Sequence, residues 1–107
     1  MVILRQYTDT GGRNPFALWF AELDGVTAVR VETALLRLRD GNVSKVKSVG
    51  SGVAELKMDF GPGYRVYFGR DGKTLVILLG GGTKKRQEID IAKAQERWTD
   101  YKNQKRT

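Results

Sequence analysis

Charged and apolar side chains alternate along one strand-like segment of the chain, and this spacing is where chemistry is first suggested. Glu55, Lys57 and Asp59 are separated there by apolar residues. A period of two is that of a β-strand, whose alternate side chains share one face. After a Gly-Pro-Gly turn, Arg65 and Tyr67 continue in the same phase. If the two segments pair as a hairpin, these carboxylates, cations and phenol share one open surface.

A run of cations after the next apolar segment would lie at the rim of that surface. Thr83 is followed by Lys84, Lys85 and Arg86, directly after the three glycines 80–82. The run lacks the spacing of a nucleotide-binding phosphate loop, so we do not predict one. A glycine turn could still bring backbone amides and Lys84 to a phosphodiester. The alternative interpretation of the whole set is a solvated strand face with cross-strand salt bridges.

The composition excludes several kinds of site. The chain has no cysteine and no histidine, which excludes thiolate and imidazole metal sites, a cysteine nucleophile and a serine–histidine mechanism. Asp59, Asp71, Glu88 and Asp90 do not follow a recognisable metal-binding pattern. We therefore expect neither a metal nor a cofactor.

The basic residues are concentrated in the second part of the chain. The chain has nineteen Lys and Arg residues and twelve Asp and Glu residues, which gives a net charge of +7. Residues 1–40 are neutral in sum, so residues 41–107 carry the whole excess. This asymmetry indicates a polyanionic partner such as RNA, DNA or an acidic protein surface. The alternative is a solvated basic face that has no partner.

The elements that must position these residues follow from periodicity and turn residues. Asn14 and Pro15 are typical of a helix start, and Asp71-Gly72 is typical of a hairpin turn. The chain is long enough for one domain. The expected elements are a strand over 1–8, helices over 14–24 and 27–40, a basic loop with Lys45 and Lys47, strands over 53–60, 64–69 and 75–79, and a helix over 86–103.

This order predicts an α+β fold. We expect a small, curved, mainly antiparallel sheet of about four strands, with residues 75–79 at its centre. An N-terminal helical hairpin and a C-terminal helix are expected to pack on one face of the sheet. The longest apolar run is too short to span a bilayer, and the N-terminus lacks the form of a signal peptide. We therefore expect a soluble cytoplasmic protein.

Four motifs together resemble a known family. They are Asn14-Pro15-Phe16-x-x-Trp19, then Leu38-Arg39-Asp40-Gly41-Asn42, then a long segment from Glu55 to Phe68 with Gly63-Tyr64-Arg65 at its centre, then Gly81-Gly82-x-Lys84-x-x-Gln87-x-x-Asp90-Ile91. The set is similar to toxins of bacterial type II toxin–antitoxin modules, in the RelE/HigB/ParE superfamily, and most to the short addiction module killer proteins. The resemblance covers about residues 14–98 and implies the same RelE-like fold, β-α-α-β-β-β-α.

The resemblance implies a ribosome-dependent endoribonuclease that cuts messenger RNA in the decoding site. It places Arg65 at the scissile phosphate and Lys84 as a second cation. A lysine pair of RelE-type toxins falls on Glu55 and Lys57, and a tyrosine falls on Asp90. The residues expected to be catalytic are Arg65, Lys84, Lys57 and Asp90; those expected to bind RNA are Lys45, Lys47, Tyr67, Lys85 and Arg86.

Attack by a ribose 2′-hydroxyl needs three things: a neutralised phosphate, a deprotonated nucleophile and a protonated leaving oxygen. Arg65 suits the first task through its two-pronged donors. Lys57 or Lys84 could act as base or acid, and Asp90 or Asp59 is an alternative base. No metal is required in this scheme.

Two other functions remain open at this point. One is a gyrase inhibitor of the ParE type, because the same fold serves both activities. The other is an inactive relative that only binds nucleic acid or its antitoxin. The expected partners are the ribosome, messenger RNA and a cognate antitoxin, a helix-turn-helix protein encoded next to the toxin.

Overall fold

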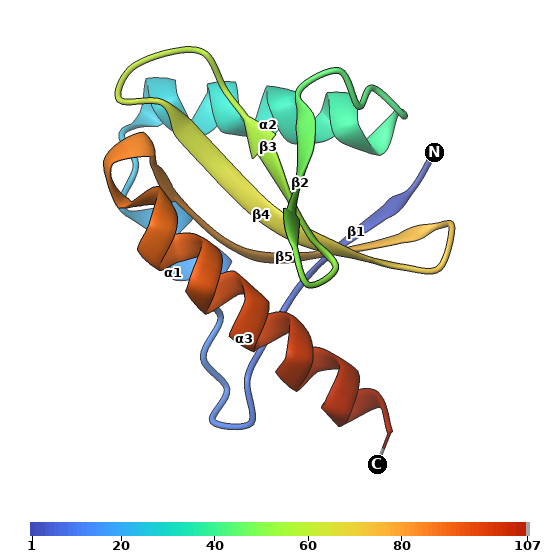
Figure 1. Cartoon of the computed structure of the whole chain (residues 1–107). Coiled ribbons are helices and arrows are strands. Elements are labelled where there is room, and N and C mark those ends of the chain that lie inside the picture. The colour runs from blue at the N-terminus through green and yellow to red at the C-terminus, as the bar shows by residue number, and fades with distance from the viewer. Residues whose placement is uncertain (107) are drawn as a thin grey trace.

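Five strands and three α-helices make up the fold in a computed structural model that describes residues 1–106 (Figure 1). In chain order they are β1 (Ile3–Gln6), α1 (Pro15–Ala21), α2 (Gly25–Arg39), β2 (Val46–Gly50), β3 (Val53–Lys57), β4 (Tyr64–Asp71), β5 (Leu75–Thr83), a 3₁₀ turn η1 (Lys84–Arg86) and α3 (Gln87–Lys105). The predicted α+β class is confirmed.

The strands form one mixed sheet in the order β1-β5-β4-β3-β2. β1 runs parallel to β5, and the other three pairs are antiparallel. β5 therefore lies between two strands, as its apolar sequence predicts. In the β3–β4 hairpin, Glu55 pairs with Tyr67 and Lys57 pairs with Arg65. The predicted phase of the hairpin is thus correct.

The prediction of about four strands is wrong, because the basic segment after α2 forms β2. Lys47 pairs there with Glu55 of β3. β2 is an edge strand in which only Val46 and Val49 are half-buried, so its sequence shows little apolar alternation. A tight turn joins it to β3, with positive φ at Gly50, Ser51 and Gly52. β5 is also longer than predicted and includes the glycines 80–82.

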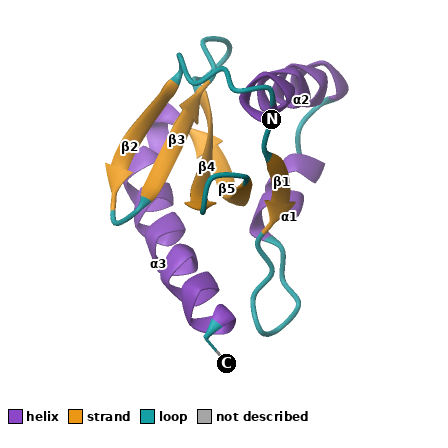
Figure 2. Ribbon diagram, turned by 90° about the vertical axis from the view of Figure 1, so that its right-hand side faces the viewer, coloured by secondary structure: helices purple, strands orange, loops and turns teal. Residues whose placement is uncertain are grey.

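Helices cover both faces of the sheet, which corrects the expectation that they pack on one face (Figures 1 and 2). On one face Phe16 of α1 and Val31 of α2 join a core with Val66 and Phe68. On the other face Ala94 and Trp98 of α3 join a second core, whose sheet residues are Val53, Tyr67, Ile77 and Leu79. Side chains of both phases are buried in β4 and β5, and a sheet that is buried on two faces needs a helix layer on each.

Side-chain caps fix where α1 and α2 begin. The amide of Ala17 donates to Asn14 Oδ1 at 3.0 Å, and Pro15 occupies the first turn, as predicted. The amide of Thr27 donates to Asp24 Oδ1 at 2.8 Å, so α2 begins two residues earlier than its apolar stripe indicates. The hydrogen bonds that Asp24 accepts from the amide and the hydroxyl of Thr27 hold the pKa of Asp24 below its ordinary value. Within residues 1–106, no helix is both long enough and apolar enough to cross a membrane.

Candidate functional site

The turn between β3 and β4 borders a pocket of about 430 Å³ that gathers residues from three elements. Lys57 ends β3, Arg65 follows in β4, and Lys84 begins η1. The turn is tied to η1, because the amide of Lys84 donates to the carbonyl of Pro62 at 3.3 Å. Three of the four residues that we expect to be catalytic therefore line one pocket, although they come from positions 57, 65 and 84.

Arg65 is held in place by groups inside the protein. Its side chain is 6% exposed, and its Nε lies 3.2 Å from Oε1 of Glu55, which is 3% exposed. Its Nη1 donates to the carbonyl of Gly63 at 2.6 Å. Glu55 Oε1 accepts a hydrogen bond from Nε2 of Gln87 in α3 at 2.6 Å. The guanidinium is thus fixed at the wall of the pocket before any ligand arrives.

The expectation of one open polar surface is wrong for Glu55, Arg65 and Tyr67, because α3 covers them. All three residues are buried. The alternation of charges predicts their common face correctly, but it does not show that a helix packs on that face. Lys57 and Asp59 remain exposed.

Lys57 and Lys84 are the exposed cations of the pocket. Lys57 Nζ lies 3.5 Å from Asp59 Oδ1, while Lys45 Nζ donates to Asp59 Oδ2 at 2.6 Å. The bond from Lys45, with the charges of both lysines, holds the pKa of Asp59 below its ordinary value. Asp59 is therefore an ionised, weakly basic carboxylate at the wall of the pocket.

Asp90 belongs to the first turn of α3 and is not among the residues that line this pocket. Its Oδ2 is buried and has no hydrogen-bond partner within residues 1–106, and it lies so close to Gly82 that a Cβ there would overlap it. Burial raises the pKa of Asp90, against the opposing charges of Arg86, Lys93 and Arg97. Asp90 therefore does not line the pocket of the other three residues expected to be catalytic, although it lies against Gly82, the partner of Arg65 in the β4–β5 pairing.

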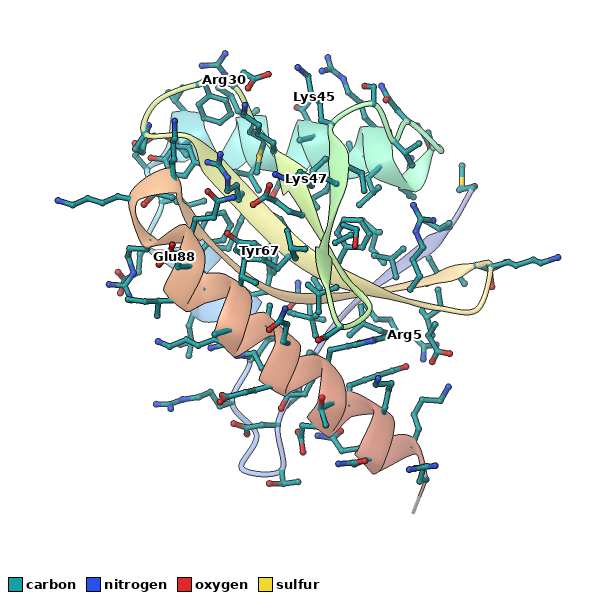
Figure 3. The ribbon with its side chains drawn as sticks, viewed as in Figure 1. Arg5, Arg30, Lys45, Lys47, Tyr67 and Glu88 are labelled. Atoms are coloured by element: carbon teal, nitrogen blue, oxygen red, sulfur yellow. The ribbon has the colours of Figure 1, made fainter. Side chains whose placement is uncertain are left out.

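Of the residues expected to bind RNA, Lys45, Lys47, Lys85 and Arg86 are exposed. Tyr67 is 1% exposed and lies beside α3, where RNA has no access to it (Figure 3). Its hydroxyl has no hydrogen-bond partner among the residues that the structure describes. Burial raises its pKa, and the charges of Glu55 and Asp90 act in the same direction. This corrects the expectation for Tyr67.

The glycines 80–82 are strand residues that let large side chains approach the sheet. Trp19 lies against Gly81 from the α1 side, and Asp90 and Arg97 of α3 lie against Gly82 and Gly80. Arg97 Nη1 also donates to the carbonyl of Leu79 at 3.0 Å. They do not form the phosphate-binding turn that we considered. Consecutive glycines after an apolar strand are a signal of such close approach.

Sequence reasoning missed a second groove, which lies between α2 and β3. Its volume is about 420 Å³, and its lining includes Arg30, Arg37 and Phe60. Arg30 and Arg37 are seven residues apart on α2 and so share a helix face, which was the available signal. Among residues 1–106, the acidic side chains form no group of three that could hold a metal ion.

Comparison with known proteins finds a relative of this chain. No family model matches the chain. A Haemophilus influenzae protein described as uncharacterized is 41% identical over 81 residues, which are 75% of this chain and 82% of the relative. Identity at this level over most of both chains shows common descent and a common fold. The chain therefore belongs to the same family as this H. influenzae protein.

Proposed function

We propose that the protein is the toxin of a type II toxin–antitoxin module, and that it cuts messenger RNA on the ribosome. The observation that carries the proposal is the pocket lined by Lys57, Arg65 and Lys84. Clustered cations of this kind bind the phosphate backbone of RNA. The Gly63-Tyr64-Arg65 and Gly-Gly-x-Lys84 motifs, which carry the resemblance to the RelE/HigB/ParE superfamily, meet at this pocket.

In the proposed reaction, the 2′-oxygen of a ribose attacks the adjacent phosphorus and the bond to the 5′-oxygen breaks. The products are a 2′,3′-cyclic phosphate and a 5′-hydroxyl. Arg65, fixed by Glu55 and Gly63, neutralises the charge that develops on the phosphate oxygens. A preorganised guanidinium needs little rearrangement when the charge develops.

Lys57 and Lys84 are the candidates for proton transfer. One ammonium group gives its proton to the leaving 5′-oxygen, and the proton of the 2′-hydroxyl passes to a base. Asp59 is the carboxylate in the pocket wall, and its lowered pKa makes it a weak base. Weak intrinsic basicity is consistent with an enzyme that works only where the ribosome orients the RNA.

A binding toxin without nuclease activity is the second candidate, and the Glu55–Arg65 pair favours it. A guanidinium that is already paired with a buried carboxylate has less charge available for a phosphate. In that case the basic surface would be a docking surface for gyrase, nucleic acid or an antitoxin. We propose a helix-turn-helix antitoxin encoded next to the toxin as the cellular partner in either case.

The two candidates can be separated with purified protein. We expect the wild type to cut a defined messenger RNA on translating ribosomes and to leave the same RNA intact without them. Lys57→Ala/Lys84→Ala should reduce the cleavage rate by at least about 100-fold, the usual scale for removal of acid–base groups. Lys73→Ala/Lys102→Ala removes the same charge elsewhere and serves as the control. Intact RNA with inhibited gyrase supercoiling would establish the second candidate instead.

A further inference from the structure

The groove between α2 and β3 adjoins the pocket of Lys57, Arg65 and Lys84. Residues 57–60 line both depressions. The groove is of similar size to the pocket, and its other walls come from α2, from Leu56, and from Asn42, Ser44 and Lys45. A strand bound in the pocket can therefore continue into the groove without leaving the surface of the protein.

Positive charge exceeds negative charge in this groove. Its lining contains four cations, Arg30, Arg37, Lys45 and Lys57, and one carboxylate, Asp59. Asp59 is already engaged by the two lysines. Within residues 1–106, Arg30 and Arg37 form no ion pair of their own, and both are exposed. An anion that enters the groove therefore meets two arginines that are free to bind it.

Arg30 also offers a surface for a nucleobase. Its guanidinium lies over the ring of Phe60, 4.2 Å from the ring centroid. Phe60 packs in turn against Tyr64, with 5.3 Å between ring centroids. Arg30 and Lys45 project on the side of the molecule where α2 lies (Figure 3). Unpaired bases stack on arginine planes that are supported in this way.

We propose that this groove is a second RNA subsite, which binds the nucleotides next to the scissile phosphate. Arg30 stacks against a base, and Arg37 and Lys45 bind backbone phosphates. The preferred ligand is single-stranded RNA, because the bases of a duplex are not free to stack on Arg30. The subsite deepens the proposed function, from which it takes RNA as the ligand.

The test is the binding of a fluorescein-labelled single-stranded RNA, measured by anisotropy at several salt concentrations. We compare the wild type with Arg30→Gln/Arg37→Gln and with the control Arg5→Gln/Arg13→Gln, which removes two exposed arginines far from the groove in sequence. The groove variant should bind at least about 10-fold more weakly than the control. Its plot of log affinity against log salt should be less steep by about 0.7 for each phosphate that the variant no longer binds.

A further variant isolates stacking from charge. Arg30→Lys keeps the positive charge but lacks the planar group. Its affinity for single-stranded RNA should be at least about fivefold lower than that of the wild type, and the salt dependence of binding should be unchanged. Circular dichroism of each variant checks that the fold is intact, which we expect because both arginines are exposed.

Several results would overturn the subsite. One is that the groove variant and the control bind single-stranded RNA with equal affinity. Another is that the wild type binds duplex RNA as tightly as single-stranded RNA. A third is that polyglutamate binding depends on Arg30 and Arg37 whereas RNA binding does not. The proposed function fails separately. A wild type that binds RNA through the groove but cuts no messenger RNA on ribosomes supports the subsite and contradicts only the nuclease.

Discussion

Arg65 lies both in the candidate pocket and in a buried ion pair, so a substitution there would change both. Its guanidinium lines the candidate pocket and is also the partner of the buried carboxylate of Glu55. Reduced activity in an Arg65 variant would therefore report on folding as well as on catalysis. Lys57 and Lys84 are exposed, so their substitution is the cleaner test of the pocket.

The Glu55–Arg65 pair makes a stability prediction. Arg65→Met should lower the free energy of unfolding by about 3–5 kcal/mol, because it leaves Glu55 buried without its cation. Glu55→Leu/Arg65→Met should recover most of this stability, since it removes both charges. Urea unfolding measures both values. A single variant as stable as the wild type would show that the pair does not hold β3 and β4 together.

Asp90 predicts a specific pH dependence. Burial raises its pKa above the ordinary 3.8, so the folded chain holds this proton more tightly than the unfolded chain does. The folded state therefore loses stability as the pH rises from about 4 through the raised pKa. Asp90→Asn removes the titrating group, and should melt at a higher temperature than the wild type at pH 7 and at an equal one at about pH 3. Parallel stability profiles of the two proteins would contradict this account.

At the scale of elements, α3 is the feature that separates the predicted surface from the observed pocket. The helix itself and its stripe through Ala94 and Trp98 are predictable from a period of 3.6, and both are buried as expected. Which sheet face it covers depends on long-range packing, because the glycine at position 69 leaves room for the indole of Trp98. A glycine inside a strand indicates close approach, but it does not identify the partner.

The packing of α3 on β4 can be tested by adding one methyl group. A Cβ at Gly69 would lie 2.5 Å from Cε3 of Trp98, so Gly69→Ala should displace the helix and cost about 1–3 kcal/mol of stability. Gly25→Ala is the control, because within residues 1–106 no atom other than those of its chain neighbours and of the backbone of its own helix lies within 4 Å of its Cβ position. Thermal unfolding of the two variants should differ clearly. Equal melting temperatures would mean that α3 does not pack on Gly69.

At the scale of the whole molecule, the sequence predicts the α+β class, the β3–β4 phase and the start of α1, because these depend on local periodicity and capping. It misses β2, whose edge position leaves little apolar pattern, and the two-sided helix cover. For the site, the sequence identifies Lys57, Arg65 and Lys84 as candidate residues. That these three residues line one pocket follows only from the fold. The groove of Arg30 and Arg37 is missed because it joins α2 to β3.

The central claim is that the pocket of Lys57, Arg65 and Lys84 cuts messenger RNA on the ribosome. The most direct measurement is primer-extension mapping of cellular transcripts after brief induction of the wild type, of Lys57→Ala/Lys84→Ala and of Lys73→Ala/Lys102→Ala. We predict cuts inside translated reading frames for the wild type and the control. These cuts should be absent in the pocket variant and when translation initiation is blocked. Intact transcripts in cells whose growth has stopped would contradict the account.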